Sequence, residues 1–211
     1  MSLLRDLVAA VAPTLADLGV RRRPGRSLTV PGERGDSIMI SLQSVPSGLP
    51  DRAEFMVNIS NHLLPWTAYL RDVSLDEARA KPPQYAEGVY RTRLSCPSSS
   101  YLPELWTVTG ESLLAVIEDL STELRGELTT VWLPLLPRAE LRAQIRDRDR
   151  KGPSHLRDRP TTDLLCRIED LSEGDLQDLL RYFRSRAEDY PDRGRLARWI
   201  ERTFLAEPAS A

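Results

Sequence analysis

Hydrophobic residues at the start of the chain recur with helical spacing. The apolar stripe returns every three or four positions and consists of Leu3, Leu4, Leu7, Val8, Val11, Leu15 and Leu18. Gly19 follows directly, at the position after a helix end where a left-handed backbone is tolerated. The pattern predicts an amphipathic helix that ends at Gly19.

Five short segments further along alternate apolar and polar positions, as half-buried strands do. They cover residues 27–30, 37–43, 54–60, 88–95 and 106–109. The turn sequences PGERGD and VPSGLPD separate the first three of them. Short turns between consecutive strands indicate an antiparallel meander and not parallel strands joined by crossover helices.

The second half of the chain is helical in pattern. Leu113, Ile117, Leu120 and Leu124 form one stripe. Residues 147–162 contain almost no apolar side chains and two prolines, which is typical of a linker. Beyond them, Ser172 stands three residues before Asp175, a helix-capping pattern that Ser74 and Glu77 show earlier in the chain.

These patterns together predict an α+β fold. We expect an N-terminal helix and a mostly antiparallel sheet of about five strands covered by helices, with a helical C-terminal appendage. The predicted division is an α+β domain over residues 1–146, a linker over 147–162 and a helical segment over 163–211. Whether that segment packs on the domain is left open by the sequence.

Charge and cysteine content restrict the function classes. The net charge of −2 argues against a general polyanion binder, and therefore against nucleic acid as the partner. Only Lys81 and Lys151 are lysines among 29 basic residues, so arginine is the ordinary cation of this chain and a cluster of arginines carries less meaning. Cys96 and Cys166 are far apart and form no disulfide framework, which favours a reducing, cytoplasmic setting.

Neither a secretion signal nor a membrane span is predicted. The apolar run LVAAVAP resembles part of a signal peptide, but Asp6 occupies the region that should be positive and Pro13 ends the run. No stretch approaches the roughly 20 apolar residues that cross a bilayer. We therefore expect no membrane partner.

Catalytic and metal-binding patterns are not found in the sequence. The hydroxyl-rich segment SCPSSSY lacks the glycines of a nucleophile elbow. His62 and His155 are the only imidazoles, and with two isolated cysteines they form no recognisable ligand spacing. No glycine-rich phosphate loop occurs. The sequence thus predicts no catalytic set, no metal site and no cofactor.

The strand phases do predict one candidate binding face. If the apolar sides of the strands face the helices, the opposite side presents hydroxyl, amide and guanidinium groups. The residues that we select there are Ser41, Gln43, Asn58, Ser60, Arg91 and Arg93, beside Ser27, Thr29, Thr107 and Thr109. Guanidinium groups bind oxyanions in a bidentate manner, although the solvated side of an antiparallel sheet is polar by default.

A second candidate patch lies in the stretch LGVRRRPGRSLTV. It consists of Arg21, Arg22, Arg23 and Arg26, between the predicted first helix and first strand. These side chains could grip phosphates. The alternative is an exposed connection whose cations are favoured by the end of the preceding helix.

Several short pieces, taken in order, resemble a bacterial family catalogued as domain of unknown function 4304. The pieces are LGVRRRPGRSLTV, ISLQSVPSG, FMVNISNH, and YRTRLS followed by WTV. The resemblance covers residues 3–146, and this chain departs from it by carrying Val20 and Leu28 where the family tends to have aromatics. It implies the α+β fold and brings no assigned activity.

The sequence favours a non-enzymatic bacterial protein that binds another protein through the polar sheet face, with an immunity-like or antitoxin-like role as one form of it. One alternative is an enzyme or sensor that acts on a small anionic ligand held by the sheet-face arginines. The other alternative is a nucleic-acid-binding protein that uses the cluster from Arg21 to Arg26.

Overall fold

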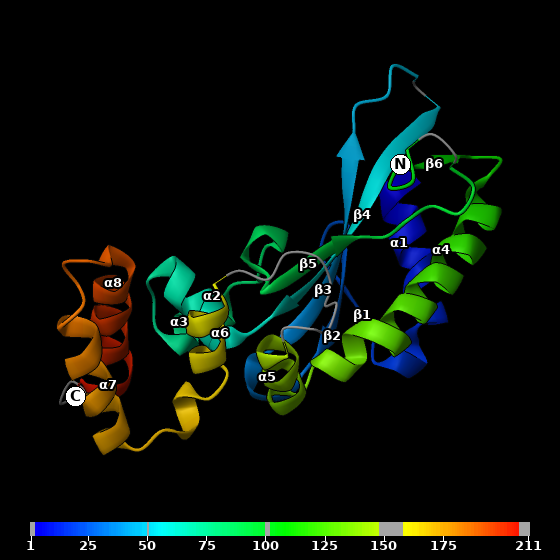
Figure 1. The fold of residues 1–211 in the computed structure, drawn as a ribbon. Helices are drawn as coiled ribbons and strands as arrows, with labels where there is room; N and C mark the ends of the chain where they lie inside the picture. Colours follow the sequence, from blue (N-terminus) through cyan, green and yellow to red (C-terminus); the bar gives the residue numbers. More distant parts are fainter. Residues whose placement is uncertain (1–2, 50, 100–101, 148–157, 207–211) are drawn as a thin grey trace.

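The computed structural model describes residues 3–49, 51–99, 102–147 and 158–206 (Figure 1). The first helix, α1 (Leu3–Thr14), buries Leu4, Leu7, Val8 and Val11, which confirms the apolar stripe. A 3₁₀ turn (Ala16–Leu18) continues it, and Gly19 ends the turn with a left-handed φ of 76°.

All strands of the sheet pair in antiparallel fashion, as the sequence predicted. They are β1 (Arg21–Arg23), β2 (Ser27–Pro31), β3 (Ser37–Val45), β4 (Arg52–His62), β5 (Tyr90–Arg93) and β6 (Trp106–Thr109). Their order is β1-β2-β3-β4-β5, and β6 also pairs with β4. One edge of β4 therefore pairs with β5 over residues 58–61 and with β6 over residues 52–55.

The strand β1 was missed by the sequence analysis, which treated these arginines as a connection. Arg22 pairs with Leu28 and Arg23 with Ser27, and Gly25 makes the turn between the two strands with a φ of 87°. Three identical residues in a row show no alternation of polarity, so the period-two signal of a strand is absent there.

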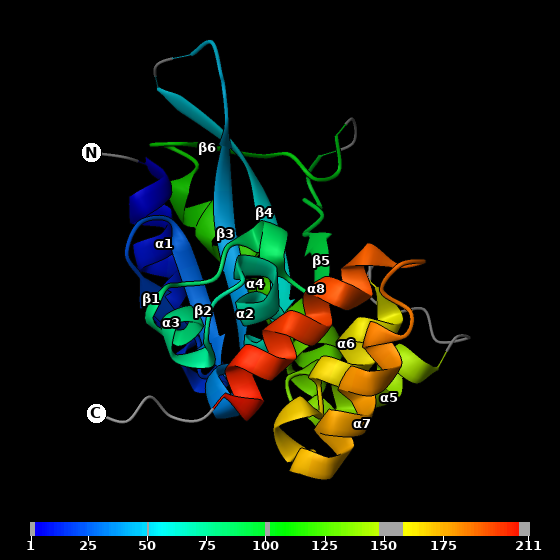
Figure 2. The same cartoon turned by 90° about the vertical axis from the view of Figure 1, so that its left-hand side faces the viewer.

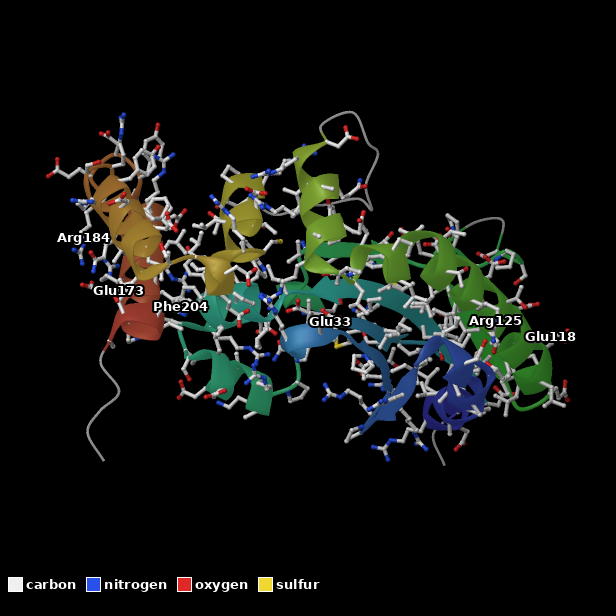
Figure 3. All side chains as sticks on the ribbon, turned by 90° about the horizontal axis from the view of Figure 1, so that it is seen from below. Glu33, Glu118, Arg125, Glu173, Arg184 and Phe204 are labelled. Carbon is white, nitrogen blue, oxygen red and sulfur yellow. The ribbon has the colours of Figure 1, made fainter. Side chains whose placement is uncertain are left out.

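Helices cover the apolar face of the sheet. α1 and α4 (Leu113–Glu127) lie side by side on it, and a π-helical turn (Leu128–Trp132) follows α4 (Figure 1). Figure 3 shows Arg125 of α4 directed toward the N-terminal helix, where it donates to Asp17 at 2.7 and 2.9 Å. Phe55, Ile59 and Trp132 are fully buried in this layer.

Two short helices lie against the other face. α2 (Leu64–Arg71) and α3 (Leu75–Ala80) stand in front of the lower end of β3 and β4, while the β3–β4 hairpin rises above them (Figure 2). The capping pattern predicted for Ser74 and Glu77 is present, since the Ser74 hydroxyl accepts from the Glu77 backbone N–H at 3.2 Å.

The C-terminal helices pack on the rest of the molecule. After α5 (Arg138–Arg146) come α6 (Arg159–Leu165), α7 (Glu173–Arg184) and α8 (Pro191–Ile200). The capping pair Ser172 and Asp175 begins α7 as predicted. Trp199 of α8 is fully buried, and its indole N–H donates to the Val73 carbonyl, between α2 and α3, at 2.9 Å.

The predicted linker, residues 147–162, is helical at its end. α6 begins at Arg159 because the Asp158 carboxylate accepts from the Thr161 backbone and hydroxyl, an arrangement that starts helices. Residues 148–157 of that linker lie outside the described residues. Within the part of the chain that the structure describes, no helix is long and apolar enough to cross a bilayer.

Candidate functional site

Two rows of paired residues cross the polar face of the sheet, and an arginine stands at both ends of each row. The first row is Arg23, Ser27, Ser41, Asn58 and Arg93, and the second is Arg21, Thr29, Met39, Ser60 and Arg91. Directly paired residues share a face. The structure thus places Arg21 and Arg23 of the second candidate patch on the same face as Arg91 and Arg93.

The middle of this face is less exposed than the sequence suggested. Asn58 and Ser60 are 2% and 0% exposed, so they are not part of a solvated surface. Asn58 donates to the Gln43 side chain at 3.1 Å, while Ser60 lies 2.8 Å from the Nε2 atom of His62. Ser60 is buried where the residue Gly88, which follows a 3₁₀ turn, η3 (Tyr85–Glu87), lies directly against it.

Arg91 and Arg93 already have partners within the molecule. The Arg91 guanidinium lies 5.8 Å from the centre of the Tyr85 ring, and Arg93 donates to Glu104 at 2.9 Å. The charge of Arg93 is therefore partly neutralised, whereas Arg91 keeps its full charge beside an aromatic face.

The arginines of the β1–β2 hairpin differ from most others. Arg21, Arg22, Arg23 and Arg26 form no ion pair and no side-chain hydrogen bond with the described residues. By contrast, arginines elsewhere are held by carboxylates, among them Arg71 by Glu87, Arg125 by Asp17 and Arg142 by Asp163. Arg22 faces away from the polar rows, and Arg26 lies in the turn. Of these four arginines, Arg21 and Arg23 are therefore the ones that lie on the polar face, at its β1 edge.

A cavity of about 190 Å³ opens where the polar face meets α2 and α3. A third row of the sheet, Pro31, Ser37 and His62, forms one wall. Burial lowers the pKa of His62 to about 3, with Glu87 opposing and Arg71 supporting the shift. The imidazole is accordingly neutral at pH 7. The sequence analysis treated His62 as an isolated residue, although the alternation through Asn58 and Ser60 continues to it.

A larger cavity of about 520 Å³ lies between α6, α7 and α8. Arg193 lies 4.3 Å from the centre of the Tyr190 ring and 5.7 Å from that of Tyr182. Burial would raise the pKa of Asp163 in its wall, but hydrogen bonds from Arg146 and Arg142 outweigh it and lower the pKa. Asp163 is therefore neutralised by arginines of the protein itself.

The residues considered for chemistry do not converge. Cys96 Sγ lies 3.2 Å from the Ser98 hydroxyl in the SCPSSSY segment, and the histidine nearest in sequence, His62, is bonded to Ser60. Burial raises the pKa of Cys166 to about 12, so its thiol is not a nucleophile at neutral pH. Among residues 3–49, 51–99, 102–147 and 158–206, no group of His, Cys, Asp and Glu could hold a metal ion. His155 lies outside these ranges.

Comparisons with known proteins give no relative: no family model, no curated protein and no solved structure matches this chain. The resemblance to the domain of unknown function 4304 family stays a prediction from the motifs quoted above.

Proposed function

We propose that this is a non-enzymatic bacterial protein that binds an acidic surface of another protein through the polar sheet face bordered by arginines. The observation that carries the proposal is the pair of rows that end in Arg21 and Arg23 on one edge and in Arg91 and Arg93 on the other. Arg93 is paired with Glu104, but Arg21, Arg23 and Arg91 have no carboxylate partner among the described residues, and such guanidinium groups at a rim steer an acidic partner toward the face and set its orientation.

A protein partner suits this face better than a nucleic acid. The arginines stand at the edges, and the residues between them carry uncharged hydroxyl, amide and thioether groups, of which Met39, Asn58 and Ser60 are buried. Phosphate backbones require a continuous basic path, and the net charge of −2 opposes their approach.

A cytoplasmic location and an immunity-like or antitoxin-like role are part of the same proposal. Cys96 and Cys166 are buried free thiols, which suits a reducing compartment. An immunity protein that covers an acidic toxin surface would use this kind of arginine-bordered face.

The test is affinity capture from the native lysate with matched variants as bait. Arg23→Gln and Arg22→Gln remove the same charge from adjacent positions on opposite sides of β1. We expect one stoichiometric protein that is captured by the wild type and by Arg22→Gln, and that is lost or strongly reduced with Arg23→Gln and Arg91→Gln. Equal capture by all four proteins would contradict the assignment of the face.

A parallel gel-shift series measures DNA and RNA binding at low salt. We expect no shift. Binding that falls steeply with salt and requires Arg21 and Arg23 would replace the protein partner with a nucleic acid.

A further inference from the structure

The cavity at the lower end of the polar face is enclosed by parts of the chain that are far apart in sequence. Arg23 and Thr29 come from the β1–β2 hairpin, and Ser37 and His62 come from the central strands. Thr67 of α2 and the segment from Ala78 to Pro83 close the other side. The cavity therefore has a polar floor from the sheet and a helical wall.

Two buried polar atoms in this wall have no partner. His62 is 2% exposed and Thr67 is 3% exposed. The Nδ1 atom of His62 and the hydroxyl of Thr67 form no hydrogen bond. Buried polar groups are nearly always paired, because a buried group without a partner destabilises the fold. Two such groups in one cavity wall are explained if a ligand completes them.

The hydrogen bond on the other side of the ring makes His62 suitable as a donor. The Ser60 hydroxyl lies 2.8 Å from Nε2. A neutral imidazole carries one donor and one acceptor nitrogen, so if Ser60 donates to Nε2, the Nδ1–H is the donor. Thr67 supplies a second, hydroxyl donor.

Cations surround the cavity as well. Arg23 has no ion pair among the described residues, and the Lys81 ammonium has none either, since only the Lys81 carbonyl is bonded, by Arg71. Arg79 adds a third charge, although it is shared with Asp76 at 2.7 Å. Arg23, which has no ion pair among the described residues, and Lys81, whose charge also acts on Glu77, therefore stand beside the two unpaired donors.

Two of the carboxylates nearby are each neutralised by an arginine, whereas Glu77, which interacts electrostatically with Lys81, is hydrogen-bonded by Ser74. Asp36, which also lines the cavity, accepts two bonds from Arg138, at 2.6 and 3.0 Å. The charge of Glu87 acts on His62, and the Glu87 carboxylate accepts two hydrogen bonds from Arg71, at 2.7 and 2.6 Å.

We propose that this cavity binds a small oxyanion, in the form of a phosphate or carboxylate group, held by Arg23 and Lys81 and by the hydrogen-bond donors of His62 and Thr67. The volume of about 190 Å³ is below the range of pockets that hold drug-sized molecules, and it accommodates a compact anion. The site shares Arg23 with the proposed partner-binding face, whereas Lys81, His62 and Thr67 belong to the cavity alone, so Lys81→Gln and Thr67→Val separate the two proposals.

The experiment is calorimetric titration of the full-length protein at low ionic strength, with inorganic phosphate in one arm and acetate in the other. We expect saturable binding in at least one arm, and the tighter arm identifies the anion class. Arg23→Gln and Lys81→Gln should each weaken binding about tenfold or more, because a hydrogen bond to a charged group contributes about 1.5–3 kcal/mol. Arg22→Gln, on the opposite side of the same strand, should bind as the wild type does.

Two further measurements locate the anion without relying on charge removal. Thr67→Val keeps the side-chain shape, and we expect it to weaken binding while the unfolding midpoint changes little. The ring nitrogens of His62 in the wild-type protein should shift in ¹⁵N spectra as the anion is added. No binding of either anion at 10 mM, equal binding by Arg23→Gln and Arg22→Gln, or unshifted His62 nitrogens on saturation would each overturn the proposal.

Discussion

The Arg138 guanidinium donates to both carboxylate oxygens of Asp36, with Nε 2.6 Å from Oδ2 and Nη2 3.0 Å from Oδ1. The side chains are 11% and 6% exposed. Asp36 also accepts from the backbone N–H of Leu64 at 2.8 Å, and Arg138 also donates to Glu169. One buried pair thus joins the start of β3, the start of α2, α5 and the C-terminal segment.

Removing Arg138 should be strongly destabilising. Arg138→Met keeps the length of the side chain but leaves the Asp36 carboxylate buried without its cation. We expect the free energy of unfolding to fall by about 3–5 kcal/mol, measured by urea denaturation at pH 7. The matched control is Arg146→Met in the same helix, where the arginine is 58% exposed and Arg142 still pairs with Asp163. The control should change stability by about 1 kcal/mol or less, and equal losses in both variants would contradict this account.

Trp199 tests whether the C-terminal helices belong to the same cooperative unit as the sheet. It is fully buried, donates to the Val73 carbonyl, and packs edge to face on Tyr69 and Phe204. Figure 3 shows Phe204 at the same end of the molecule as Arg184. Trp199→Ala should lower the unfolding free energy of the whole chain by about 3–5 kcal/mol.

Trp199→Phe keeps an aromatic ring and loses the indole donor, so we expect its free energy of unfolding to fall by less than that of Trp199→Ala. Unfolding is followed by circular dichroism at a wavelength that reports the strands as well as the helices. If the C-terminal segment unfolded independently of the sheet, the main transition would not move in either variant.

The strands whose side chains alternate between apolar and polar could be predicted from the sequence, together with the face on which each side chain lies. The phase of Ser41, Asn58 and Arg93 followed directly from period two, and the observed register places all three in one row. β1 could not be found in this way because it consists of three arginines, so its two faces have the same polarity and no alternation is visible. Its assignment depends on pairing with β2, which is a tertiary property.

The cavity could not be predicted from the sequence, for a different reason. His62 could have been placed on the polar face by continuing the alternation two residues past Ser60. Thr67 and Lys81, however, lie in a stretch with no strand phase, and only the packing of α2 and α3 brings them to the sheet. The burial of Ser60 also depends on tertiary packing, since Gly88 lies against it.

His62 should make stability depend on pH in a defined window. Desolvation lowers its pKa from 6.5 to about 3 in the folded protein. The unfolded chain therefore takes up the proton first as the pH falls, so the stability is intact above pH 6.5 and is lost progressively between pH 6.5 and 3. Within this window each pH unit changes the free energy of unfolding by about 1.4 kcal/mol. The free energy of unfolding should therefore fall by roughly 2.5 kcal/mol between pH 6.5 and 4.5.

The measurement is urea denaturation at pH 7.5, 6.5, 5.5 and 4.5, in a His155→Gln background that leaves one histidine. Carboxyl groups with lowered pKa, such as those of Asp17 and Asp175, act mainly at lower pH, where their unfolded forms begin to take up protons. Replacing His62 by Gln in the same background should flatten the profile above pH 4.5. A wild-type profile that is already flat there would show that His62 is not held neutral by burial.

Gly88 gives a direct test of how closely η3 sits on the polar face. Its backbone is extended with a φ of −62°, which any residue adopts, but a Cβ there would lie 2.6 Å from the Cβ of Ser60 and 2.9 Å from the Tyr90 carbonyl oxygen. Gly88→Ala should therefore reduce the unfolding free energy by about 1–3 kcal/mol, because the turn must lift from the strand. Gly126, inside α4, has nothing within 4 Å of such a Cβ, so Gly126→Ala should instead stabilise the protein by about 0.5–1 kcal/mol. Opposite signs for the same substitution, measured by urea denaturation, are the expected result; a gain at both glycines would mean that η3 does not cover Ser60 as closely as described.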